Sequence, residues 1–168
     1  MFYIVTAENN YDIIVVNPNT MKIAKTIPGG NFYAFGIATY NDEVYLCNSE
    51  QIAKLNTDGT IMVLCNYSLP NTANFLYFVK QNFGCDGKYA YLLVNRNNAI
   101  IKVLLNTGEI TDVFNLDEGN GLYPYGEIES CYFDNGFLYL TGALYYNTNR
   151  GVFISTLFKF NLNSSIIT

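Results

Sequence analysis

The acidic and aromatic residues best suited to binding chemistry lie in one segment, residues 117–129, which reads DEGNGLYPYGEIE. Glu127 and Glu129 are separated by one residue, so on a strand they would share a face. Carboxylate oxygens are the ligands that Ca²⁺ prefers, and the same groups could line a polar ligand pocket. The segment lacks the spaced D-x-D-x-D-G pattern, which favours a solvated loop leading into an inner strand. We therefore take Tyr123, Tyr125, Glu127 and Glu129 as candidate ligand-binding residues and assign no metal ligands.

A second candidate site is the long hairpin expected at residues 143–151, ALYYNTNRG. Tyr145 and Tyr146 precede Asn147 and Asn149 there. Tyrosine and asparagine on a loop tip suit adaptable recognition of a ligand. A solvated loop that binds nothing is the alternative interpretation of the same residues.

The composition excludes several classes of function. The chain has no histidine, which removes Ser-His-Asp and Cys-His nucleophile systems. We assign no catalytic residue and expect no cofactor. The net charge is −5 and the nine Lys and Arg residues form no run, so nucleic acid is not an expected partner. No apolar run approaches the length of a membrane span, and the N-terminus has no basic signal-peptide region, so we expect no membrane insertion and a cytoplasmic or virion location.

The four cysteines, Cys47, Cys65, Cys85 and Cys131, have no metal-type spacing. We expect them to be buried thiols in the core. Cys47 and Cys65 fall in different expected strands of one unit, so a disulfide between them stays open as an alternative.

Residues 31–64 contain four short β-forming runs separated by turn residues. Asp58-Gly59 is the strongest turn signal, because glycine supplies the positive φ that a tight hairpin needs. Asn41-Asp42 is a second turn pair. The stretch therefore predicts a four-stranded antiparallel meander, with strands at Phe35–Tyr40, Glu43–Asn48, Gln51–Leu55 and Thr60–Leu64.

Landmarks of this unit recur along the chain in the same order, which indicates stacked repeats. NFYAF at 31–35 recurs as NFLYF at 74–78, and FYAFG at 32–36 as LYPYG at 122–126. The tyrosines Tyr33, Tyr77, Tyr123 and Tyr125 belong to these landmarks, and packing between units is the favoured interpretation for them. The repeats predict one domain of four units, at about 1–28, 31–69, 74–116 and 121–168.

Three parts of the second unit carry a resemblance to known repeats. Phe35-Gly36-Ile37, Val44-Tyr45-Leu46 and Ile52 to Gly59 resemble the "GI" strand, the "lYv" strand and the "I..l...G" hairpin of NHL and YVTN-type propeller repeats. The Asp that often follows the "GI" strand is not evident, and the chain has no Trp for a WD pair. The resemblance implies an all-β, β-propeller-like array of about four four-stranded antiparallel blades.

The first blade is expected to lack its inner strand, because Phe2–Thr6 matches the second strand of the repeat. The edge of Phe2–Thr6 would then be unpaired, and unpaired edges recruit other strands. We therefore expect self-association, or binding of another protein, through the open edge of the first blade.

These features predict a non-enzymatic propeller that serves as a binding or assembly module. The Asn-rich, Lys-poor composition suggests a phage or viral structural or host-recognition component. One alternative is a carboxylate- and metal-dependent hydrolase of the lactonase-like kind, and another is a lectin-like propeller that binds glycans. Several carboxylates converging at a channel mouth would favour the hydrolase.

Overall fold

The computed structural model describes residues 1–6, 11–68, 81–94, 99–115, 127–146, 152–162 and 166–167. Within these ranges, only the backbone is described for residues 81–82, 94, 115, 127–131, 142–146, 152–156, 158 and 166–167. The strands are β1 (Phe2–Val5), β2 (Ile13–Asn17), β3 (Lys22–Ile27), β4 (Gly36–Tyr40), β5 (Glu43–Cys47), β6 (Gln51–Leu55), β7 (Ile61–Asn66), β8 (Gln81–Asn82), β9 (Gly84–Cys85), β10 (Tyr89–Val94), β11 (Ala99–Leu104), β12 (Ile110–Asn115), β13 (Glu127–Asp134), β14 (Phe137–Tyr146), β15 (Val152–Asn161) and β16 (Ile166–Ile167).

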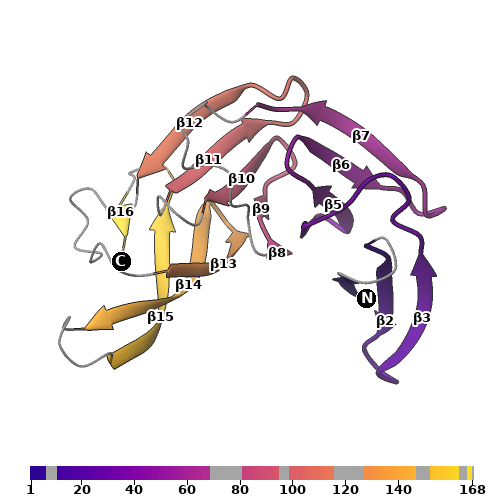
Figure 1. Ribbon diagram of the computed structural model, residues 1–168, viewed down its shortest axis with the longest axis horizontal. Helices are drawn as coiled ribbons and strands as arrows, with labels where there is room; N and C mark the ends of the chain where they lie inside the picture. The colour runs from indigo at the N-terminus through magenta and orange to yellow at the C-terminus, as the bar shows by residue number, and fades with distance from the viewer. Residues whose placement is uncertain are drawn as a thin grey trace.

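The strands form four sheets, and the described chain contains no helix. The strand orders are β1-β2-β3, β7-β6-β5-β4-β8, β12-β11-β10-β9 and β13-β14-β15-β16. Neighbouring strands are antiparallel except for the short parallel pair β4–β8. Figure 1 shows the sheets following one another around an arc, with β3, β7 and β12 on its outer rim and the first and fourth sheets at its two ends. The predicted all-β array and the three-stranded first sheet are confirmed.

The turns and irregularities of the sheets also repeat. Asn41 and Asp42 both have positive φ (48° and 62°), as do Asn135 and Gly136 (48° and 81°). This is the conformation that two-residue hairpins require. A register shift recurs in the last strand pair of each of the first three sheets, after Val15, Ile52 and Lys102. The first three sheets therefore share an irregularity in their last strand pair, although its place along the strand differs from sheet to sheet.

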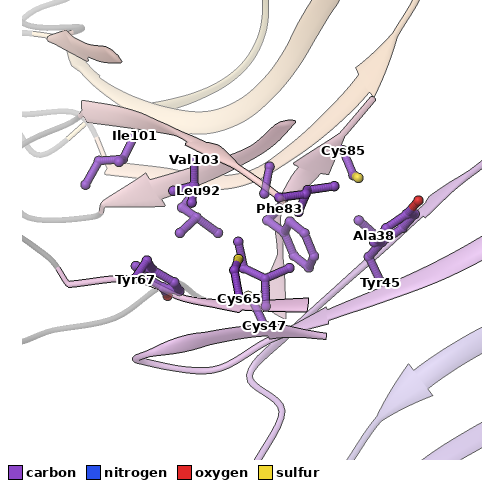
Figure 2. Packing of buried hydrophobic residues seen from close by; sticks show 13 residues of the cluster. Ala38, Tyr45, Cys47, Cys65, Tyr67, Phe83, Cys85, Leu92, Ile101 and Val103 are labelled. Atoms are coloured by element: carbon purple, nitrogen blue, oxygen red, sulfur yellow. The ribbon is translucent and has the colours of Figure 1, made fainter. Parts of the chain in front are cut away.

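One apolar cluster lies at each junction between neighbouring sheets. Ile13 and Val15 pack against Leu46 at the first junction. Phe83 and Cys47 belong to the second cluster, in which Figure 2 shows the residues of both sheets gathered around Phe83. The third cluster includes Leu93 of β10 with Leu138 and Phe160 of the fourth sheet. The core is thus a series of packed sheet faces, in which each inner sheet is covered on both sides.

Two sequence expectations about side chains can be judged here. Cys47, Cys65 and Cys85 are buried and none of them forms a disulfide, so the prediction of core thiols is confirmed for these three. The side chain of Cys131 is outside the described residues. Tyr33 is 49% exposed, and its ring meets the edge of Tyr11 at 5.7 Å between centroids. Tyr33 therefore packs against Tyr11 of the first unit while about half of its surface stays exposed, and Tyr77, Tyr123 and Tyr125 lie outside the described residues.

Candidate binding site at the axis of the arc

The innermost strands β1, β4, β9 and β13 line the axis of the arc, where the structure has a cavity of about 680 Å³. Its walls come from three sheets. The described lining residues are Met1, Tyr3, Thr39, Tyr40, Asn41, Asp42, Val44, Tyr132, Phe133, Asp134, Asn135 and Gly136. A second cavity of about 310 Å³ shares Met1, Tyr3, Thr39, Tyr132 and Phe133 with the first and is also lined by Phe2, Ile37, Ala38, Phe83 and Cys85.

Hairpin geometry explains why polar residues meet at the mouth of the larger cavity. The turns that follow β4 and β13, the first strands of their sheets, both line the larger cavity. These turns carry Asn41-Asp42 and Asn135-Gly136, whose positive φ values suit Asn, Asp and Gly. The cavity mouth is therefore polar because tight turns favour Asn, Asp and Gly at these positions.

Aromatic rings connect the walls of the cavity. Phe133 stacks on Tyr91 with centroids 5.6 Å apart and ring planes 7° apart, and Tyr40 meets Phe133 edge to face at 6.2 Å. Such pairs contribute about 0.5–1.5 kcal/mol each beyond the burial of area. Tyr132, next to Phe133 on β13, is 59% exposed. The cavity thus combines a fixed aromatic wall with an exposed ring.

A tyrosine–carboxylate hydrogen bond recurs behind the turns of the second and third sheets. Tyr45 donates to Glu43 and Tyr91 donates to Asp86, both at 2.7 Å. Burial, followed by the bond to the carboxylate, raises the pKa of both tyrosine hydroxyls. The bonds from Lys54 and Tyr45 lower the pKa of the Glu43 carboxyl. These carboxylates are already bonded within their own sheets and serve to fix the hairpins.

The part of the chain that the structure describes holds no group of three or more Cys, Asp or Glu side chains close enough to bind a metal ion. The described residues also include no helix that could cross a membrane.

The candidate residues expected from the sequence are only partly described. Tyr123 and Tyr125 lie outside the described residues. Glu127 and Glu129 lie at the start of β13, with only their backbone described. The register of β13 with β14 shifts between Ile128 and Ser130. This bulge interrupts the strict alternation that was expected to place the two carboxylates on one face.

Tyr145 and Tyr146 lie in strand β14, where Tyr145 pairs with Phe153 and Tyr146 with Val152. They are thus the last residues of β14 before residues 147–151 of the expected hairpin, which lie outside the described residues, and their part in binding a ligand stays a prediction. Their side chains are outside the described part.

The sequence did not reveal the lining residues Tyr3, Tyr40, Tyr132 and Asp134. A signal for them exists, because Tyr40-Asn41-Asp42 and Asp134-Asn135-Gly136 occupy the same repeat position, immediately before the second strand of their sheets. The Asn41-Asp42 turn was expected, but its place at the axis depends on the arrangement of the sheets.

Comparison with known proteins shows the class of fold. No protein-family model matches the chain, and no curated protein matches its sequence. Similar solved structures include glutaminyl cyclase of Myxococcus xanthus (12% identity, TM-score 0.60, covering 92% of this chain and 67% of that chain). A nidogen/laminin complex matches at 14% identity and TM-score 0.57, covering 99% of this chain and 59% of that chain. The Pan2 WD40 domain of Neurospora crassa matches at 9% identity and TM-score 0.53, covering 99% and 50%.

The protein is a β-propeller by fold, and its sheets are blades. At these identities the likeness shows the fold alone. The chain spans two thirds of the glutaminyl cyclase chain and less of the other two. The particular NHL or YVTN kinship stays a prediction.

Proposed function

We propose that the protein is a non-enzymatic propeller module that assembles with a second copy of itself through the open end of its first blade. The observation that carries the proposal is the first sheet, β1-β2-β3, which has three strands among the described residues where the other sheets have at least four. Its innermost strand, β1, borders the axial cavities through Met1, Phe2 and Tyr3. An added strand would lie beside β1 and form a further wall of these cavities.

The backbone of β1 supports this proposal. Among the described strands, only β2 pairs with β1. The N–H of Thr6 donates to the carbonyl of Asp12 at 2.9 Å, which makes Thr6–Asp12 a hydrogen-bonded pair of the antiparallel ladder. Hydrogen-bonded and non-hydrogen-bonded pairs alternate along such a ladder, so Tyr3 and Val5 are in non-hydrogen-bonded pairs. Their N–H and C=O groups therefore point away from β2. An open row of donors and acceptors is a template for another strand.

The outward face of the first sheet is apolar and exposed. Ile13 and Val15 of β2 are buried on the face that packs against the second blade. On the opposite face, register places Phe2 beside Val16 and Val16 beside Ile23. Phe2 is 54% exposed and Ile23 63%. The inner blades bury both faces, so a neighbouring copy would give this face the cover that the other blades have.

Replacing Val5 with proline tests whether the free edge of β1 pairs with another strand. Val5→Pro removes an N–H that points away from β2, and it leaves the bonds between β1 and β2 in place. We expect Val5→Pro to raise the dissociation constant of the assembly about 10-fold or more, equivalent to about 1.4 kcal/mol. Val5→Ala keeps the N–H and is the matched control. Sedimentation equilibrium measures both, and equal association of the two variants would count against pairing at β1.

Sugar binding at the axial cavity is a second candidate function. The lining combines the rings of Tyr3, Tyr40 and Tyr132 with the side chains of Asn41 and Asp42, and stacking on aromatic faces with polar groups at the rim suits a neutral glycan. Titration with neutral oligosaccharides tests it through tyrosine emission, since the chain has no Trp. Saturable binding that Tyr132→Ala weakens is expected; a panel without saturable binding would remove this candidate.

The proposed phage or viral role stays a prediction from composition alone. The lactonase-like alternative finds no convergent set of metal-binding side chains among the described residues.

A further inference from the structure

The longest hairpin among the described residues, formed by β14 and β15, extends beyond its own blade. β14 and β15 have ten residues each and pair along their whole length. β13 pairs with β14 only as far as Ala143, and β16 pairs with β15 only at Phe160 and Asn161. The outermost pairs, Leu144–Ile154, Tyr145–Phe153 and Tyr146–Val152, therefore have no third strand in the described structure. We call residues 144–146 and 152–154 the arm; Figure 1 shows β14 and β15 projecting from the end of the arc.

The arm has an unusual composition for an isolated two-stranded ribbon. Such a ribbon is marginally stable in water unless it packs against something else. All six arm residues are apolar or aromatic, and none is charged. Strand positions alternate between two faces, so both faces of the arm are assigned apolar residues. Strands with this pattern are typical of sheets that are covered on both sides.

Strand β1, at the open end of the first blade, has the free edge with which the arm can pair. Strand β1 is four residues long, FYIV, and carries no charge, so it matches the three residue pairs of the arm in length and chemistry. The outward groups of Tyr3 and Val5 supply backbone partners, and pairing two uncharged segments requires no buried charge. Phe2 and Ile4, which are 54% and 49% exposed, supply an apolar surface beside that edge.

We propose that the arm of one copy adds to β1 of a second copy, and that the exchange is reciprocal. Each chain contributes one arm and one open end, so two copies related by a two-fold axis satisfy both. This inference rests on the proposed function, because it names the segment that fills the open edge. It gives Tyr145 and Tyr146 a role in assembly in place of binding at a loop tip.

The test compares two substitutions in the same strand, β15. Phe153→Asp places a charge in the arm, whereas Leu157→Asp makes the same kind of change where β13 also pairs with β14, at a side chain that is 66% exposed. We expect Phe153→Asp to raise the dissociation constant at least about 10-fold, and Leu157→Asp to leave it near that of the unmodified protein. Circular dichroism checks that both variants keep their strand content.

Amide hydrogen exchange supplies the second readout. In the assembled protein, the amides of Tyr3 and Val5 are expected to be protected, and in Phe153→Asp they are expected to exchange rapidly. If the unmodified chain never associates, the proposed function fails and this inference fails with it. A different outcome is that the unmodified chain associates, that Phe153→Asp associates equally, and that the amides of Tyr3 and Val5 remain protected. That result would disprove the role of the arm and leave assembly through β1 intact.

Discussion

Gly108→Ala is expected to lower the free energy of unfolding by about 3–5 kcal/mol, combining overpacking with a left-handed backbone. Gly108 has a φ of +76°, and a Cβ there would lie 1.7 Å from the carbonyl oxygen of Asn66. This oxygen belongs to the backbone, so no side-chain rotation can move it aside. Gly108 follows β11 in the third blade and Asn66 ends β7 in the second, so alanine must push two blades apart. The apolar cluster between those blades would be disrupted with them.

Gly136→Ala is the matched control. Gly136 has a similar φ of +81°, but no atom lies within 4 Å of the position its Cβ would take. The cost there is the backbone conformation alone, about 1–2 kcal/mol. Urea unfolding of the two variants separates the close approach of the blades from the turn conformation. Equal losses at Gly108 and Gly136 would contradict the described packing of the second and third blades.

The second large effect is loss of stability at high pH. Burial raises the pKa of the Cys85 thiol to about 12, from an ordinary value of 9.0. Burial also raises the pKa of Tyr67 above its ordinary value of 10.0, and the Tyr67 hydroxyl donates to the carbonyl of Asn48 at 2.5 Å. In the unfolded chain both groups lose their protons near their ordinary pKa values. In the folded chain they keep them, so rising pH favours unfolding.

The free energy of unfolding is therefore expected to be insensitive to these groups below pH 9 and to fall above pH 10. Each group contributes a slope of about 1.4 kcal/mol per pH unit until the pH passes its folded pKa. Urea midpoints measured from pH 7 to pH 12 test this expectation. Tyr67→Phe should flatten the decline above pH 10, with a cost of about 1 kcal/mol at pH 7 for the lost hydrogen bond. A stability that is constant to pH 12 would contradict the burial of these groups.

The blades could be predicted from the sequence because their signals are local. Strands and turns follow from β-forming runs such as EVYLC at β5 and from pairs such as Asp58-Gly59, where Gly59 has a φ of +96°. The three described strands of the first sheet also followed, since Phe2–Val5 matches the second strand of the repeat. Local patterns suffice where one residue pair decides the turn and alternation decides the buried face.

The axial site could not be predicted in the same way. Tyr40 and Phe133 are far apart in sequence, and their contact depends on how the blades curve around the axis. The bulge in β13 and the length of β14 are settled by pairing with neighbouring strands, which the segment itself does not encode. Glu127, Glu129 and Tyr145 were therefore singled out for their residue types, while the described lining of the cavity comes from ordinary strand and turn residues of three sheets.

The most direct test of the account is the absolute mass of the unmodified protein in solution, measured by light scattering across a range of concentrations. Reciprocal pairing of open ends predicts a species of twice 18.9 kDa that dissociates on dilution. A mass of 18.9 kDa at every concentration would contradict assembly through the first blade.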